Sequence, residues 1–117
     1  MGRERLDYGE HGEDRAARAL LARGYRIVER NFRCKAGELD LVARDHDDTL
    51  VFIEVRTRAD DRHGGALAAV GFHKQRQVAR VARFYLATRK PRFDTCRFDV
   101  VAITGSDLVV IKDAFRA

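Results

Sequence analysis

Two acidic residues on neighbouring predicted strands are the side chains of this chain best suited to chemistry. Asp40 stands between Leu39 and Leu41, and Glu54 lies within the mainly apolar segment 50–56. Pairing of these strands would bring the two carboxylates close together, where they repel unless a cation lies between them. Mg²⁺ is held by one or two carboxylates together with waters and a substrate phosphate. The pattern therefore predicts a divalent-metal pocket and, with it, cleavage of nucleic-acid phosphodiester bonds.

Glu13 is expected to supply a third carboxylate. On a helical wheel it falls among Leu6, Ala17 and Leu20, on the stripe that must face the sheet, where an acid is rare without a reason. Glu10 lies near the same arc and is the alternative if the register of the helix differs. The expected ligands of Mg²⁺ or Mn²⁺ are Asp40, Glu54 and Glu13.

A structural role for Glu54 stays open beside the metal site. A carboxylate buried in an apolar strand is costly, so such groups pair with a cation, shift their pKa or bind a metal. Arg56 and Arg58 follow on the same strand and could supply an ion pair.

The second predicted helix, over residues 70–88, carries the basic charge. Residues 61–90 hold seven Lys or Arg against one Asp, a net charge of +6, whereas the whole chain carries +5. Such a stripe indicates a phosphate-bearing partner, because each neutralised phosphate releases a condensed counterion, although a solvated helix face is the alternative. Lys74 projects from the core-facing stripe of Val78, Val81 and Tyr85, so it can reach the acidic pocket or snorkel at the helix start. The residues expected to contact nucleic acid are Arg58, Lys74, Arg76, Arg80 and Arg83.

The elements that must position these residues follow the order α-β-β-β-α-β-β. Helical spacing predicts helices over residues 6–23 and 70–88, ended by Gly24 and Pro91. Alternation and β-branched content predict strands over residues 25–33, 38–44, 50–56, 97–104 and 108–114, the last two joined at Gly105-Ser106. A connection over residues 57–69, centred on Gly64-Gly65, is expected to be mobile. The fold class is therefore α/β, with a mixed central sheet flanked by helices.

Length and composition favour a single domain over residues 1–117, since the chain is long enough for one hydrophobic core and too short for two. No apolar run approaches the roughly 18 residues of a spanning helix, and the N-terminus lacks a signal peptide. The protein is therefore expected to be cytoplasmic, without a membrane partner. Cys34 and Cys96 match no metal-ligand spacing and are expected to be reduced thiols. The absence of a Gly-rich phosphate loop and of a nucleophile elbow argues against nucleotide-binding folds and hydrolase triads.

Several short motifs, spread from about residue 9 to about residue 103, complete the pattern. They are Gly12-Glu13-Asp14, Arg30-Asn31, Gly37-Glu38-Leu39-Asp40-Leu41-Val42-Ala43, Phe52-Ile53-Glu54-Val55-Arg56-Thr57-Arg58, Lys74 and Arg97-Phe98-Asp99-Val100-Val101. In combination they resemble the bacterial YraN-like family of the PD-(D/E)XK restriction-endonuclease-like superfamily, which is similar to the archaeal Holliday junction resolvases. The resemblance implies a restriction-endonuclease-like domain.

The resemblance also implies a role for each matching acid. Asp40 and Glu54 are similar to the two strand-borne metal ligands of the superfamily, and Glu13 to the helix-borne glutamate that completes the site. Arg56 stands where the superfamily pattern has lysine. Arginine, with a pKa above about 12, cannot act as a base and can only donate hydrogen bonds or stabilise charge. The expected catalytic residues are Glu13, Asp40, Glu54, Arg56 and Lys74.

Three functions remain open from the sequence. The first is a Mg²⁺-dependent endonuclease acting on DNA, branched or single-stranded. The second is a non-catalytic nucleic-acid-binding module with a degenerate nuclease site. The third is a scaffold protein whose acids form structural ion pairs. The resemblance allows a homodimer, since related nucleases pair to cut two strands, but no segment identifies an interface.

Overall fold

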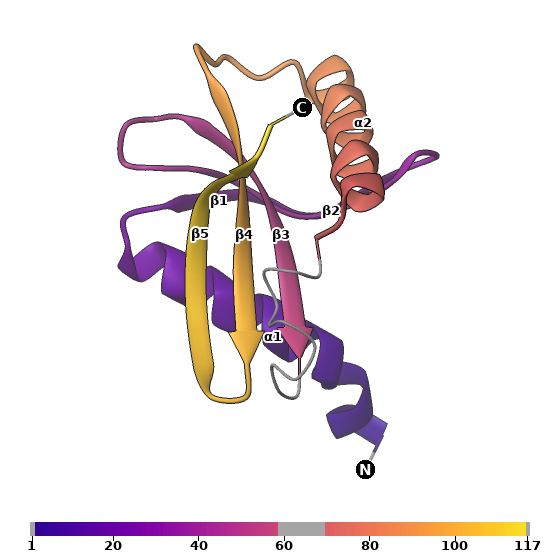
Figure 1. Cartoon of the computed structure of the whole chain (residues 1–117), viewed down its shortest axis with the longest axis vertical. Coiled ribbons are helices and arrows are strands. Elements are labelled where there is room, and N and C mark those ends of the chain that lie inside the picture. The colour runs from indigo at the N-terminus through magenta and orange to yellow at the C-terminus, as the bar shows by residue number, and fades with distance from the viewer. Residues whose placement is uncertain (1, 59–69, 117) are drawn as a thin grey trace.

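The computed structural model describes the backbone of residues 2–58 and 70–116 and the side chains of residues 12–58 and 70–116. In this part of the chain, two helices and five strands follow one another in the order α-β-β-β-α-β-β (Figure 1). They are α1 (Gly2–Ala22), β1 (Arg26–Cys34), β2 (Gly37–Arg44), β3 (Leu50–Arg58), α2 (Phe72–Arg89), β4 (Cys96–Thr104) and β5 (Asp107–Phe115). Neither of these helices is both long enough and apolar enough to span a membrane.

The predicted fold class and element order are confirmed, with differences at some ends. α1 begins at Gly2 and α2 at Phe72, rather than at residues 6 and 70. β3 runs two residues further than predicted, because its pairing with β4 continues to Arg58 and Thr104. The remainder of the connection predicted to be mobile, Gly64-Gly65 included, lies outside the described residues.

The strands form one sheet in the order β1-β2-β3-β4-β5. β3 and β4 are parallel and the other neighbours are antiparallel. A parallel pair needs a crossover connection, and α2 lies within the one between β3 and β4. The sheet is therefore mixed and central, with α1 on one face and α2 on the other (Figure 1).

Each face of the sheet has its own hydrophobic core. On one face Val81 and Tyr85 of α2 pack with Phe52 of β3, and the Tyr85 ring meets the Phe52 ring edge-on at 5.7 Å between centroids. On the other face Leu20 of α1 packs with Ile53. Successive residues of β3 thus serve opposite cores, as the two-residue period of a strand requires. β3 therefore contributes side chains to the cores under both helices.

Helix α1 ends in a turn that only a few residue types tolerate. Gly24 has a φ of 90°, which favours glycine because it has no Cβ. The Gly24 N–H donates to the Leu21 carbonyl at 3.1 Å and the Tyr25 N–H to the Leu20 carbonyl at 3.0 Å. These two bonds form a Schellman motif. The turn leads straight into β1 and leaves Tyr25 buried beneath the sheet.

Tyr25 joins an ion cluster formed around Arg97 and Asp99 of β4. Arg97 donates from Nε to Asp99 Oδ1 and from Nη1 to Asp45 Oδ2, both at 2.8 Å. The Tyr25 hydroxyl donates to Asp99 Oδ2 at 2.9 Å. Burial and the bond to Asp99 raise the pKa of Tyr25 to about 12, so the hydroxyl keeps its proton. Asp99 also accepts from the Asp113 N–H of β5 at 3.0 Å, so the cluster joins β4 and β5 to the residue before β1 and the residue after β2.

Arg97→Met should lower the free energy of unfolding by about 3–5 kcal/mol, because it leaves the buried carboxylates of Asp99 and Asp45 without their cation. Urea unfolding followed by circular dichroism measures the change. Arg33→Met is the matched control, since its ion pair with Glu38 is exposed and should contribute less than about 1 kcal/mol. Equal costs for the two variants would contradict a structural role for the cluster.

Candidate functional site

β2 and β3 stop pairing just before the two predicted strand acids. Their ladder runs from Arg44↔Leu50 to Leu41↔Ile53. Beyond this point β2 continues beside β1 alone. A ladder that ends inside a protein leaves backbone groups that need new partners. The site forms at this divergence of the strands.

Asp40 supplies one of the missing partners. Its Oδ2 accepts a hydrogen bond from the N–H of Val55 at 2.7 Å. The side chain therefore takes the place of a backbone carbonyl across the gap between β2 and β3. This bond holds the Asp40 carboxyl group beside the next residue back along β3, Glu54.

Glu54 and Asp40 come into contact at the divergence. The Glu54 side chain is only 4% exposed, and it shares a hydrogen bond with the Asp40 side chain. Burial, followed by the charge of Asp40, raises the pKa of Glu54 to about 7, although Lys74 acts in the opposite direction. Two ionised carboxylates in contact repel strongly, so the pair needs either a shared proton or a cation.

Lys74, near the start of the crossover helix α2, brings a positive charge to this pair. Its Nζ lies 3.2 Å from Glu54 Oε2. Lys74 precedes the buried Val78 by one helical turn, so it belongs to the stripe of α2 that faces the sheet. The helix start therefore delivers a cation to the acids, as the helical spacing of the sequence indicated.

Glu13 approaches from α1. Gly12, next to it, lies so close to β3 that a Cβ there would be 2.9 Å from Thr57 Oγ1. The Glu13 carboxyl group hydrogen-bonds to the side chain of Asn31, but its Oε1 atom is buried without a hydrogen-bond partner. Burial and the nearby charge of Asp40 raise the pKa of Glu13. A carboxylate oxygen without a hydrogen-bond partner, next to a pair of acids, is free to coordinate a metal ion.

Asn31 is a site residue to which the sequence analysis gave no role. It has a φ of 55° and lies between the pairs Arg30↔Leu41 and Phe32↔Leu39, opposite Asp40. Asn tolerates this left-handed region better than most residues. Its bond to Glu13 fixes the orientation of that carboxyl group. The signal was present as an Asn within a strand otherwise made of charged and apolar residues.

The acids form a pair with a third carboxylate beside it, and not a compact trio. Among residues 12–58 and 70–116, no three His, Cys, Asp or Glu side chains converge in a way that could hold an ion. The donor set still fits Mg²⁺ or Mn²⁺, because Mg²⁺ takes one or two carboxylates and fills its other positions with water and substrate oxygens. The repelling pair Asp40–Glu54 and the orphaned oxygen of Glu13 are the atoms that such an ion would satisfy. The side chain of Glu10, the alternative, is outside the described residues.

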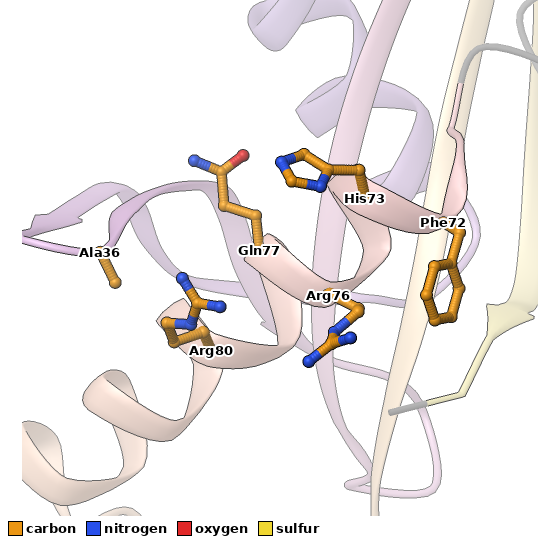
Figure 2. Close-up of a pocket in the computed structure, with 6 residues that line it drawn as sticks. All are labelled: Ala36, Phe72, His73, Arg76, Gln77 and Arg80. Atoms are coloured by element: carbon orange, nitrogen blue, oxygen red, sulfur yellow. The ribbon is translucent and has the colours of Figure 1, made fainter.

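The remaining predicted site residues lie in two places. Arg56 is half-buried two residues after Glu54, and Arg58 is exposed at the end of β3. Arg76, Arg80 and Arg83 are exposed on α2. Arg76 and Arg80 border a hollow shown in Figure 2, and all three border a second hollow beside it. The predicted nucleic-acid-binding residues therefore divide: Lys74 contacts the acids, whereas the three arginines of α2 turn away from them.

Comparison with protein families gives a match over most of the chain. The model of a family described as "Uncharacterised protein family UPF0102" matches residues 12–103. A UPF0102 protein of Methylibium petroleiphilum is 50% identical over 115 residues, which cover 93% of each chain. A UPF0102 protein of Ralstonia pickettii is 50% identical over 110 residues, covering 92% of this chain and 88% of the other. A UPF0102 protein of Syntrophus aciditrophicus is 44% identical over 117 residues, covering 97% and 91%.

Among solved structures, one described as "Structure of EndoMS-dsDNA2 complex" superposes with a TM-score of 0.40 at 20% sequence identity. The superposition covers 66% of this chain and 27% of that chain, so this chain spans about a quarter of the other. A likeness of this degree carries no argument about function.

Mn²⁺ at 100 times its dissociation constant should raise the free energy of unfolding by about 2.7 kcal/mol, because the ion would bind the folded acids and not the unfolded chain. Thermal unfolding with and without Mn²⁺ measures the shift. Asp40→Asn and Glu54→Gln should each abolish it, whereas Asp94→Asn, an exposed acid outside the site, should retain it. An equal shift in Glu54→Gln and in the unaltered protein would rule out this pair as the binding site.

Proposed function

The chain belongs to the UPF0102 family, and from the geometry of its acids we propose that it is a metal-dependent nuclease that hydrolyses phosphodiester bonds of DNA. The single observation that carries the proposal is the contact between Asp40 and Glu54 at the divergence of β2 and β3. A buried carboxyl group such as that of Glu54 in contact with a second acid is expensive for a fold to keep, and arrangements of this kind mark functional sites. The pair is also the ligand set that a hydrated divalent cation needs.

Asp40 and Glu54 would hold the ion, with Glu13 as the third carboxylate. A divalent cation in such a site polarises a phosphoryl oxygen and lowers the pKa of a bound water. Asp40 is held for this task by the Val55 N–H, and Glu13 by Asn31. These bonds fix the carboxyl groups before any ligand arrives, so little reorganisation is needed on binding.

Lys74 supports the catalytic proposal. Position 56, where the resemblance expects lysine, holds arginine, but an ammonium group reaches Glu54 from α2 at 3.2 Å. A cation at this distance from a metal-binding carboxylate is placed to stabilise the charge that develops on a phosphate during hydrolysis. Arg56 adds a permanent positive charge and cannot remove a proton from water. We assign charge stabilisation to Lys74 and Arg56.

The same ion pair favours a second candidate function. Lys74 offsets the charge of Glu54 by direct ion pairing, and a carboxylate neutralised by a lysine is the arrangement expected of a degenerate site. In that case the domain would bind nucleic acid through the arginines of α2 without cleaving it.

Glu54→Gln and Asp40→Asn should each lower cleavage by at least about 100-fold, because each removes a carboxylate from the ion. Lys74→Met should lower it by about 10²–10³-fold, as for loss of one stabilising donor. Arg56→Lys should retain or raise cleavage. The measurement is gel analysis of end-labelled linear, flapped and four-way DNA incubated with Mg²⁺ or Mn²⁺. The nuclease proposal fails if no substrate yields a product that disappears in Glu54→Gln prepared in the same way.

If the domain binds nucleic acid without cleaving it, substitutions should affect DNA binding in a different pattern. Binding of labelled DNA should then survive Asp40→Ala and weaken in Arg76→Ala or Arg80→Ala, with the salt slope of log K reduced by about one for each arginine that contacts a phosphate. Fluorescence anisotropy across a salt series measures both quantities. The matched control is Arg26→Ala, an exposed arginine of β1 that pairs with Asp48 and lines neither of the two hollows beside α2. Equal losses in Arg26→Ala and Arg80→Ala would mean that α2 is not the binding surface.

A further inference from the structure

The first residue of α2 is an exposed aromatic ring. Phe72 is 72% exposed. A single exposed apolar residue needs no explanation by itself. Phe72, however, borders two neighbouring hollows of about 300 Å³ and about 260 Å³, and Arg76 and Arg80 line both of them. Figure 2 shows the first hollow, with the Phe72 ring and the guanidinium groups of Arg76 and Arg80 projecting from successive turns of α2.

Arg76 holds a defined position relative to the ring. Its guanidinium carbon lies 5.7 Å from the centroid of the Phe72 ring, within the range of a cation–π interaction. The two residues are four apart, the spacing at which side chains of a helix meet. The ring is therefore oriented by a cation while most of its surface stays accessible.

Basic and neutral side chains line the two hollows beside the ring. Residues 72–89 contain no Asp or Glu, and the second hollow is also lined by Arg83 and by Arg116, which follows β5. Arg76, Arg80 and Arg83 together with Phe72 form a surface for an anion that also carries a flat apolar group, whereas Arg116 is ion-paired with Asp113 at 3.1 Å.

Phe93 provides an internal contrast. It is 39% exposed, but its hollow is lined by three acids, Asp47, Asp48 and Asp94. An anionic ligand would be repelled there. The chain therefore exposes one aromatic ring in a basic setting and another in a mainly acidic one, so the exposure of Phe72 can be tested against a ring of the same type.

The ligand chemistry that combines phosphates with flat faces is nucleic acid. Bases of a single strand stack on aromatic side chains while the backbone follows a basic groove. A duplex keeps its bases stacked inside and presents only their edges and its phosphates. We propose that Phe72, Arg76, Arg80 and Arg83 form a binding site for single-stranded nucleic acid, in which an unpaired base stacks on the Phe72 ring.

The start of α2 connects this surface to the acids. Lys74 follows Phe72 by two residues, about 200° around the helix, so the two side chains point to opposite sides of the same turn. One faces Glu54 at 3.2 Å and the other borders the basic hollows. A strand that crosses the beginning of α2 would meet both. The inference rests on the proposed nuclease function, because it identifies the substrate of that nuclease as a strand with unpaired nucleotides.

The test is binding of a fluorescein-labelled dT20 strand to full-length protein carrying Glu54→Gln, which removes cleavage from the measurement. Adding Phe72→Leu should weaken binding by about 5- to 150-fold, the effect of losing one base–aromatic stack, whereas Phe72→Tyr should restore it. The salt slope should be the same in Phe72→Leu, because no phosphate contact is lost. Phe93→Leu, the matched control, should leave the affinity unchanged.

Two further ligands separate stacking from charge. An abasic strand of the same length should bind more weakly than dT20, and Phe72→Leu should remove most of that difference. A blunt duplex should show no dependence on Phe72. The inference is overturned if Phe72→Leu binds dT20 as the parent does, if the abasic strand binds equally well, or if Phe72→Leu acts by changing the oligomeric state in sedimentation.

The outcomes for stacking and for catalysis are independent. Loss of dT20 binding in Phe72→Leu without any Glu54-dependent cleavage would retain the binding site and reject the nuclease. Cleavage that depends on Glu54 but not on Phe72, with equal affinity of both proteins for dT20, would retain the nuclease and reject the stacking site.

Discussion

The hydrogen bond from the Val55 N–H to Asp40 is the constraint on which the rest of the site depends. β2 has to leave β3 so that it can continue with β1, and this leaves a backbone donor of β3 without its ladder partner. An aspartate is short enough to reach across, and its carboxyl oxygen accepts the bond at 2.7 Å. The consequence is a carboxyl group fixed against Glu54. The end of the β2–β3 ladder therefore creates the acidic pair, because the donor that it leaves unpaired is the one that holds Asp40.

The sheet lets two helices act on this feature from opposite faces. Because β3 contributes alternate side chains to the two cores, α1 and α2 pack against side chains of the same strand from opposite faces. α1 brings Glu13 with its unpartnered Oε1 atom, while α2 brings the ammonium group of Lys74. The hydrophobic packing of the helices thus determines the charge balance at the acids. A shift of either helix by one residue would move its polar group away from the site.

Much of this could be read from the sequence because it follows from periodicity. The element order, the burial of Glu54 and the direction of Lys74 depend only on which residues alternate or recur every turn. The position of Asn31 could not be read in this way, since a positive φ within a strand breaks the two-residue period. The length of β3 was also missed, because it is set by pairing with β4 and not by its own residues. Phe72 lies within the predicted helix, but no role was predicted for it. Its relation to the arginines depends on the hollows that these side chains line together.

Both outer strands of the sheet carry irregularities in pairing and backbone conformation. β1 shifts register between Ile27 and Glu29 and adopts a positive φ at Asn31. β5 has a positive φ at Asp113, and its pairing shifts opposite Phe98 and Val100. Bulged and kinked borders are poor templates for a foreign strand, which protects a sheet against edge-to-edge association and the aggregation that follows from it. Two copies of this chain that came together would accordingly do so through side-chain surfaces, leaving each sheet closed to its neighbour.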